Sequence, residues 1–310
     1  MALYMTFAYE MGETELFEKC RQRLKDVMVN WLTYTPGENN FFFARYQRWG
    51  ALIGYDTSYD SDTFNDHHFH YGYYTYAGAL LALFDEDFCR NYGEMLTLVA
   101  KDYANWDKSD KDFPFFRTFD PWAGHSYAGG LGGWNGNGQE STSEAMQGWG
   151  GMYLLGVATG NKEMRDAAIF GWTAESRGVA EYWFDRDNEN INRELYTKPY
   201  NSNLTSQGIG WWTWFSGDPV WMHSIQWMPI SPCLKYLSED LDFARRDYAQ
   251  MWDKKEIGGW ENENANGESL GKESGLGNVV LSYLQRFDPD SAANVFERMW
   301  NEDKPTVKNP

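Results

Sequence analysis

The chain has 310 residues, enough for one large domain or two ordinary ones with a substantial core. Its formal net charge of -18 argues against nucleic acid and anionic membrane surfaces, because such partners require clustered Lys and Arg. Its 3 cysteines are widely spaced and form no CxxC pair, which excludes the usual patterns of a disulfide framework or a zinc site.

Apolar residues recur at spacings of three and four over much of the chain. Between residues 14 and 33, for example, Leu16, Cys20, Leu24 and Trp31 form the stripe of an amphipathic helix. In chain order, the pattern predicts helices at residues 2–11, 14–33, 73–84, 87–104, 143–158, 162–183, 220–237, 240–253, 274–286 and 290–301. Helices therefore dominate, and we expect few strands.

Long polar loops separate alternate helices. They are rich in Gly, Asn, Asp and aromatic residues, and they cover residues 50–72, 105–140, 185–219 and 254–273. Loops of this length are usually functional. Helix pairs joined by short turns at one end and by such loops at the other predict an all-α fold, an α/α toroid of the (α/α)6 barrel type with its cleft on the long-loop side. We expect a single domain over residues 1–310.

Aromatic residues are unusually frequent. The chain has 16 Trp, 20 Tyr and 19 Phe, many of them set among Gly, Asn and Asp. Aromatic faces beside hydrogen-bonding side chains suit the C–H faces and hydroxyl rims of sugar rings. A core rich in aromatic residues is the alternative explanation.

Residues 65–72 hold one carboxylate and three of the 5 histidines. Asp66 and His70 share one helical face if the following helix starts near Asp66. This density of titratable groups indicates proton transfer to a substrate oxygen. One alternative makes Asp66 a helix cap beside satisfied polar histidines. Another uses Asp66, His67, His68 and His70 as metal ligands, but adjacent histidines point in different directions, so we expect neither a metal nor a cofactor.

A second motif runs through residues 135–145 into the next predicted helix. Ser141 and Glu144 match a capping box, in which Glu reaches back to the amide of the cap residue. The box explains Glu144 but gives Glu140 no structural role. A carboxylate at this junction suits a base that activates water, with Glu144 supporting it from one turn along. Asn137 is a candidate for binding the substrate.

Two further clusters are candidates for binding a sugar. Asp120 and His125 flank Trp122, so the polar groups could bind hydroxyls while the indole stacks on a ring face. A tightly turned aromatic loop explains that spacing equally well. The Trp-rich residues 211–219, with His223 soon after them, predict another wall of the cleft.

At these motifs the sequence resembles the catalytic domain of family 81 glycoside hydrolases, the endo-β-1,3-glucanases. The stretches that carry the resemblance are Asn65–Gly72, Phe119–Ser126, Gln139–Ala145 and His223–Pro229, with shorter matches at Ala158–Glu163 and Glu181–Trp183. The resemblance covers residues 45–240. It implies an (α/α)6 toroid and hydrolysis of β-1,3-glucan, such as laminarin or curdlan, with inversion.

The resemblance also implies roles for individual residues. Asp66 would be the general acid, Glu140 the general base and Glu144 a further essential carboxylate. The residues expected to contact glucose units near the scissile bond are His70, Asp120 and His125. The family usually carries a β-sandwich before the toroid. We expect that sandwich to be absent here and the toroid to be incomplete at its N-terminus.

Two other functions fit the same sequence. A non-catalytic β-glucan-binding or degenerate relative would retain laminarin without releasing reducing ends. A sugar epimerase or polysaccharide lyase on the same toroid would change the reaction. A lyase would more naturally act on acidic sugars, which suits this acidic chain poorly.

The sequence carries no apolar run of about 18 residues and no signal peptide at its start. We expect a monomer that acts on β-1,3-glucan, without nucleic acid or membrane partners. The family resemblance favours a secreted or cell-surface location, and a cytoplasmic one stays open.

Overall fold

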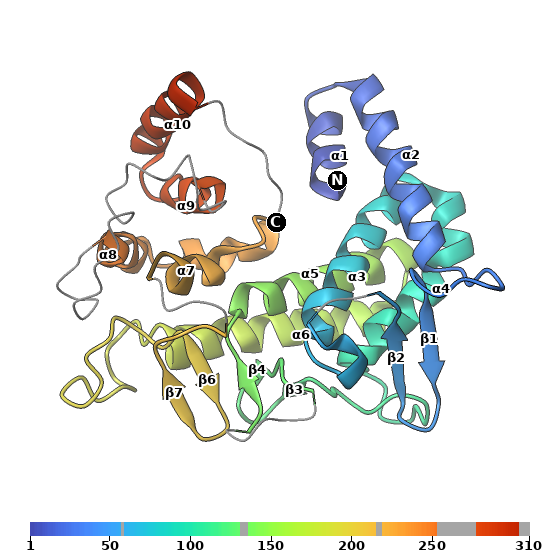
Figure 1. Ribbon diagram of the computed structural model, residues 1–310, viewed down its shortest axis with the longest axis horizontal. Coiled ribbons are helices and arrows are strands. Elements are labelled where there is room, and N and C mark those ends of the chain that lie inside the picture. The colour runs from blue at the N-terminus through green and yellow to red at the C-terminus, as the bar shows by residue number, and fades with distance from the viewer. Residues whose placement is uncertain (57–58, 131–135, 215–218, 253–276, 304–310) are drawn as a thin grey trace. The chain divides into compact units, whose positions relative to one another are not determined.

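The computed structural model describes residues 1–56, 59–130, 136–214, 219–252 and 277–303 (Figure 1). The chain divides into two compact units. The first unit comprises residues 1–139 and 144–177, and the second comprises residues 140–143 and 178–310. The expectation of one domain over residues 1–310 stays a prediction, and the loop predicted at 254–273 lies outside the described residues.

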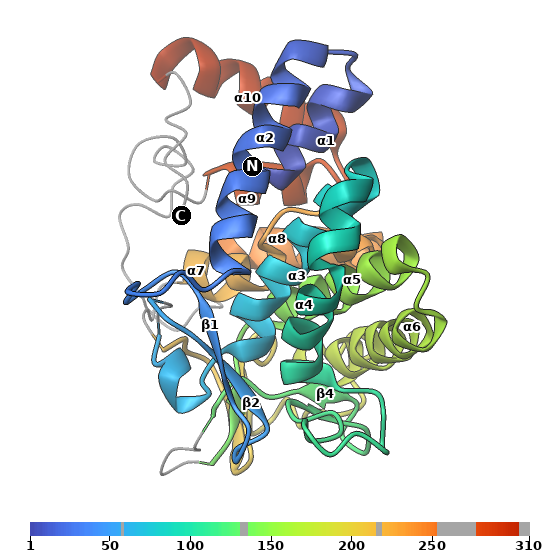
Figure 2. The same cartoon turned by 90° about the vertical axis from the view of Figure 1, so that its right-hand side faces the viewer.

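Helix hairpins build the first unit. They are α1 (Ala2–Glu10) with α2 (Thr14–Trp31), α3 (His67–Phe84) with α4 (Glu86–Ala104), and α5 (Thr142–Thr159) with α6 (Lys162–Gly178). The members of each pair lie side by side in both views (Figure 1, Figure 2). Gly12 and Gly160, both with positive φ, follow α1 and α5, and Asp85 alone links α3 to α4. Long connections follow α2 and α4, which is the alternation that the loop pattern predicts.

The helices α3 and α5 approach closely because each has a glycine at the contact. A Cβ at Gly72 would lie 2.8 Å from the Gly148 Cα, and a Cβ at Gly151 would lie 2.6 Å from the Tyr76 nitrogen. Only a residue without a Cβ fits at such a distance from the facing backbone. The close approach places the first turns of the two helices beside each other.

Short strands lie in the connections of the first unit. They are β1 (Phe43–Tyr46) paired with β2 (Ala51–Gly54), β3 (Phe119–Asp120) paired with β4 (His125–Ser126), and β5 (Gly138–Gln139). The predicted loop over residues 50–72 is wrong where β2 lies. All residues of β2 are buried, so the strand lacks the alternation of polar and apolar residues that marks a half-buried strand.

The second unit is also mainly helical. Its elements are a π-helical turn (Val179–Trp183), β6 (Asn203–Thr205), β7 (Gly208–Gly210), α7 (Pro219–Ser224), two 3-10 helices (Ile225–Trp227 and Pro232–Ser238), α8 (Leu241–Trp252), α9 (Gly277–Leu284) and α10 (Pro289–Asp303). Fully buried aromatic side chains, including Trp183, Tyr200 and Tyr283, fill its core. The single helix predicted at 220–237 is wrong, because Pro229 and Pro232 interrupt it.

Candidate active site

Asp66 lies at the N-cap position of α3 in a left-handed conformation, with φ 56°. Its side chain accepts no capping hydrogen bond from the first turn of the helix as described. Instead, Oδ2 accepts a hydrogen bond from the Asn65 side-chain amide at 3.2 Å. The backbone is fixed independently, because the Asp66 N–H donates to the Ala128 carbonyl at 2.9 Å. The local fold therefore holds the residue in place without using the carboxylate as a cap.

Tyr73 interacts with two acidic residues of the first unit, Glu144 and Asp66. It follows Asp66 by seven residues and His70 by three, so His70 and Tyr73 share the face of α3 that continues from the Asp66 cap position. Its hydroxyl donates a hydrogen bond to Glu144 Oε1 on α5. Burial, then the Glu144 carboxylate and more weakly Asp66, raises the pKa of Tyr73 well above its usual value. Tyr73 therefore stays protonated and serves as a hydrogen-bond donor to Glu144.

The three histidines of the first motif occupy different environments. His67 is fully buried, with Nδ1 2.6 Å from Asp102 Oδ2 and Nε2 2.7 Å from the Ser61 carbonyl. His68 is also buried, and its Nε2 lies 2.9 Å from the Gln139 side-chain amide. His70 is half-buried, and burial together with nearby His67 lowers its pKa. Of the three histidines, His70 is therefore the one exposed enough to meet a ligand.

The β3–β4 hairpin brings Asp120 and His125 together as directly opposite residues. Asp120 Oδ1 accepts hydrogen bonds from the N–H groups of Trp122 at 2.8 Å and Ala123 at 3.3 Å, so this carboxylate also shapes the turn. The turn presents the Trp122 side chain at 97% exposure, whereas His125 is 3% exposed. Burial lowers the pKa of His125. Asn137 is half-buried, and its side chain packs over Gly129.

Glu140 belongs to the second unit. Its Oε2 accepts a hydrogen bond from the Trp214 N–H at 2.7 Å, and its carbonyl accepts one from the Gln226 side-chain amide. Gln226 Oε1 also accepts from the Thr142 hydroxyl at 2.6 Å and from the Thr142 N–H at 3.1 Å. Gln226 therefore holds the segment that carries Glu140 at two points, the Glu140 carbonyl and Thr142, on either side of Ser141.

The candidate capping box has other partners in the structure. The Ser141 hydroxyl donates to the Ile225 carbonyl at 3.3 Å, and Glu144 accepts from Tyr73. Both side chains therefore make tertiary contacts as well as standing at the start of α5.

His223 is fully buried in the second unit. Its Nδ1 lies 2.5 Å from Asp247 Oδ1, and the rings of Tyr200 and Trp211 pack edge-on against it. Asp247 also accepts hydrogen bonds from Tyr283 and Trp227. This environment is that of a core histidine, so the predicted contact of His223 with a substrate forms no part of the function proposed below.

Two residues of the site are missing from the set predicted from the sequence. Tyr73 continues the spacing of Asp66 and His70 along one helix face, and that spacing was the available signal. Gln226 lies within the motif at residues 223–229, but its amide clamps a segment more than eighty residues earlier in the chain, which no local pattern indicates.

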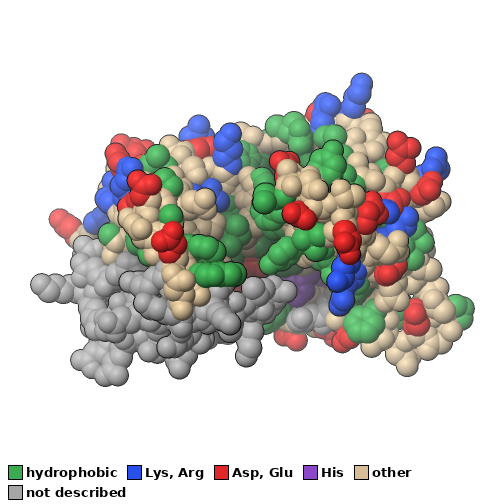
Figure 3. Space-filling model, turned by 90° about the horizontal axis from the view of Figure 1, so that it is seen from above, with side chains coloured by type: hydrophobic (Ala, Val, Ile, Leu, Met, Phe, Trp, Pro, Cys, Tyr) green, Lys and Arg blue, Asp and Glu red, His purple; other side chains and the backbone are tan. Residues whose placement is uncertain are grey.

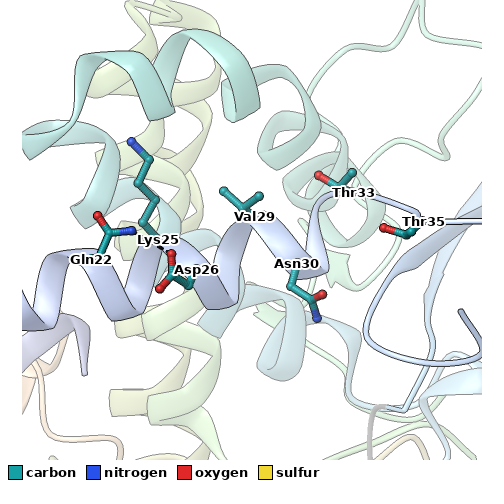
Figure 4. A pocket seen from close by; sticks show the side chains of 7 residues that line it. All are labelled: Gln22, Lys25, Asp26, Val29, Asn30, Thr33 and Thr35. Atoms are coloured by element: carbon teal, nitrogen blue, oxygen red, sulfur yellow. Dashed lines mark hydrogen bonds between the residues drawn. The ribbon is translucent and has the colours of Figure 1, made fainter.

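One hollow in the described part of the surface lies apart from the predicted site residues. A hollow along α2 (Figure 4) is lined by Gln22, Lys25, Asp26, Val29, Asn30, Thr33 and Thr35. Gln22 there donates to Asp26 at 2.7 Å. It holds none of the predicted site residues. On the described part of the face in Figure 3, basic and acidic side chains are interspersed rather than gathered into a basic patch.

Within the described ranges, no group of three or more His, Cys, Asp or Glu side chains is placed to hold a metal ion. None of the helices that the structure describes is both long and apolar enough to cross a bilayer.

The described helix hairpins carry carboxylates at the loop ends of α3 and α5, Asp66 and Glu144. Residues 1–303 match the glycosyl hydrolase family 81 C-terminal domain, and the chain belongs to this family. The match extends the resemblance predicted for residues 45–240 to nearly the whole chain.

Two similar proteins and one solved structure support the same family assignment. A glucan endo-1,3-beta-D-glucosidase from Acetivibrio thermocellus is 36% identical over 309 residues, which cover 96% of this chain and 37% of that protein. A second one, from Thermobifida fusca, is 31% identical over 315 residues, covering 98% and 39%. The solved structure of a family 81 glycoside hydrolase from Clostridium thermocellum, CtLam81A in a mutant form, has a TM-score of 0.83 at 35% identity, covering 96% of this chain and 40% of that one.

These likenesses confirm the predicted family and the predicted all-α fold class. The chain spans about two fifths of the length of the relatives it matches.

Proposed function

We propose that the chain hydrolyses β-1,3-glucan internally, with inversion, using Asp66 as the general acid and Glu140 as the general base. Membership of family 81 and the names of the relatives support the substrate and the reaction. In an inverting glycosidase, one carboxylic acid protonates the leaving oxygen while a carboxylate activates water on the opposite face of the sugar.

The observation that carries the proposal is that the Asp66 carboxylate does not cap α3, although it stands at the N-cap position. A carboxyl group at the start of a helix normally accepts hydrogen bonds from the first turn, but Asp66 makes no such bond, and its backbone is held by Ala128 instead. A carboxyl group that is not used as a helix cap can take the role of proton donor to a substrate oxygen. The acid must be protonated when the substrate binds, and burial or a neighbouring carboxylate favours that state.

The general base must stay ionised, so its carboxylate needs hydrogen-bond donors around it. The Trp214 N–H donates to the Glu140 carboxylate, and a hydrogen bond to the charged form favours ionisation. Gln226 fixes the backbone around Glu140, which limits the positions that the carboxylate can take up around a water molecule. Glu144, bonded to Tyr73, is proposed to orient the reacting groups rather than to transfer the proton itself.

The sugar contacts follow from exposure. The indole of Trp122 is almost fully exposed and can cover the apolar face of a glucose ring. Half-buried His70 and Asp120 can bind hydroxyl groups beside it. His125 pairs with Asp120 across the hairpin and is buried, so we propose that it supports the hairpin without contacting the sugar directly.

The test is product analysis on laminarin and curdlan, with xylan and cellulose as control substrates. The proposal expects new reducing ends from the two β-1,3-glucans alone, and loss of this activity in Asp66→Asn and in Glu140→Gln while binding of laminarin is retained. Retention of laminarin on an affinity gel by the wild-type chain, without new reducing ends, would support a non-catalytic binding protein instead. Unsaturated products that absorb ultraviolet light would indicate a lyase.

A further inference from the structure

Glu175 is a fully buried carboxylate that the proposed reaction does not use. It lies on α6, and three hydrogen bonds end on its oxygens. Oε1 accepts from the Ser126 N–H at 2.8 Å, and Oε2 accepts from the Ser126 hydroxyl and from Trp149 Nε1, both at 2.7 Å. No Lys or Arg among the described residues forms an ion pair with it.

Burying this carboxylate has a cost in stability, which its three hydrogen bonds offset in part. A buried carboxylate that has only neutral partners is disfavoured relative to its solvated state. Here burial raises the pKa of Glu175 to about 7, and the three donors offset only part of that effect. An apolar side chain of similar volume would remove the cost of the buried charge but leave the Ser126 and Trp149 donors buried without an acceptor. The carboxylate fixes both the backbone and the side chain of Ser126.

The fixed segment reaches Asp66. Ser126 lies two residues before Ala128, whose carbonyl accepts the Asp66 N–H at 2.9 Å. The Ser126 carbonyl accepts from the Gln139 side-chain amide at 3.2 Å, and the same amide nitrogen lies 2.9 Å from His68 Nε2 at the start of α3. Hydrogen bonds thus run continuously from α6 through β4 to the first turn of α3, and all of them lie within the first unit.

We propose that Glu175 is a positioning residue for the general acid: through Ser126 it fixes residues 126–128, and these residues set the place of Asp66. The inference rests on the proposed function, because it concerns the acid step of that reaction. It assigns Glu175 no contact with the substrate. It requires only that the three donors keep a carboxylate as their shared acceptor.

The test compares a substrate that needs the acid with one that does not. Laminarin has a poor leaving group that requires protonation, whereas 2,4-dinitrophenyl β-laminaribioside has a leaving group that departs as an anion. In Glu175→Gln, the amide nitrogen faces a hydrogen-bond donor, so at least one of the three bonds is lost. We expect kcat on laminarin to fall about 10- to 100-fold with little change in KM, and kcat on the activated glycoside to stay within about threefold.

Three companion variants make the test decisive. Asp66→Asn should give the same pattern between the two substrates. Glu163 lies on the exposed first turn of α6, so Glu163→Gln should have the kcat of the wild type on both substrates. Ser126→Ala removes the hydroxyl contact alone and takes the place of Glu175→Gln if that variant does not fold. The melting temperature and circular dichroism of each variant establish the folded fraction.

An equal loss of kcat on the two substrates, or no loss on either, would overturn the role of Glu175 and leave the proposed function standing. Wild-type protein that hydrolyses neither substrate would overturn the proposed function and the role of Glu175 together.

Discussion

Helix α3 has an aspartate at each end, and the two are used differently. Asp85, between α3 and α4, has extended backbone angles, and its Oδ1 caps α4 by accepting from the Phe88 N–H at 2.9 Å. Its Oδ2 accepts from Arg21 at 2.7 Å and Lys25 at 2.8 Å. Asp66 has a left-handed backbone and makes no cap bond. One signal in the sequence, an aspartate before a helix, thus marks a structural anchor in one place and a candidate proton donor in the other.

The pKa of Asp85 reflects its structural use. Burial opposes its ionisation, but the hydrogen bonds from Lys25 and the Phe88 N–H, with the charges of Lys25 and Arg21, outweigh burial and hold the pKa of Asp85 below its usual value. A carboxylate held in this way stays ionised and cannot act as an acid near neutral pH. The partners of an aspartate, rather than its place before a helix, decide which role it can take.

The largest effect should come from replacing each aspartate by alanine and measuring activity. Asp66→Ala should lower kcat on laminarin by about 10²- to 10⁴-fold, the usual contribution of general acid catalysis. Asp85→Ala, assayed well below its melting temperature, should keep most of the activity. A reducing-end assay at matched protein concentration measures both, and equal losses in the two variants would break the comparison.

The same two variants should rank in the opposite order when their loss of unfolding free energy is measured. Asp85→Ala removes a cap and two charged partners, so its free energy of unfolding should fall by about 1–3 kcal/mol. Asp66→Ala removes no cap bond, but it loses the hydrogen bond from Asn65 and places alanine on a left-handed backbone, so its loss should be the smaller one, about 1 kcal/mol. Urea unfolding followed by circular dichroism gives both values. A larger loss in Asp66→Ala than in Asp85→Ala would contradict the account.

Tyr73→Phe tests the contribution of the hydrogen bond between Tyr73 and Glu144. The variant loses the hydroxyl that donates to Glu144, so kcat on laminarin should fall about tenfold, the value of one hydrogen bond. Tyr74→Phe is the matched control, because the Tyr74 ring packs against Trp31 and Phe43 in the interior. Equal activity of the two variants would remove Tyr73 from the site.

A smaller effect concerns pH. The pKa of Asp85 is lower in the folded protein than its ordinary value of 3.8, so its stabilising contribution is complete above that value. The contribution disappears as the pH falls through the folded pKa. The difference in unfolding free energy between wild type and Asp85→Ala should therefore be constant from about pH 5 to 7 and shrink below about pH 4. A difference that grows on acidification would show that the carboxylate is not held as an anion.

The sequence predicts the elements whose signal is local. The stripe that predicts a helix at 14–33 gives α2 at Thr14–Trp31, because an amphipathic face repeats within the helix itself. The prediction fails where the pattern is interrupted. The helix expected from residue 73 begins at His67, because its first turn carries histidines instead of an apolar stripe.

The contacts of the site depend on long-range packing. Tyr73 meets Glu144 because Gly72 and Gly148 allow α3 and α5 to approach, and Gln226 reaches Thr142 across the second unit. Glu175 is one glutamate among several on helices, and its burial depends on Ser126 and Trp149 in other elements. Periodicity within a segment contains none of this information. The motifs around Asp66 and Glu140 stood out in the sequence because several chemical groups gather there within a few residues.

The most direct test of the central claim is time-resolved proton NMR of laminarihexaose during its first turnovers, with wild type and Asp66→Asn side by side. The account predicts that the wild type releases the α-anomer first, as inversion at a β-linkage requires. It also predicts that Asp66→Asn, equally stable, releases no detectable sugar on the same timescale. Initial release of the β-anomer, or turnover near the wild-type rate by Asp66→Asn, would contradict it.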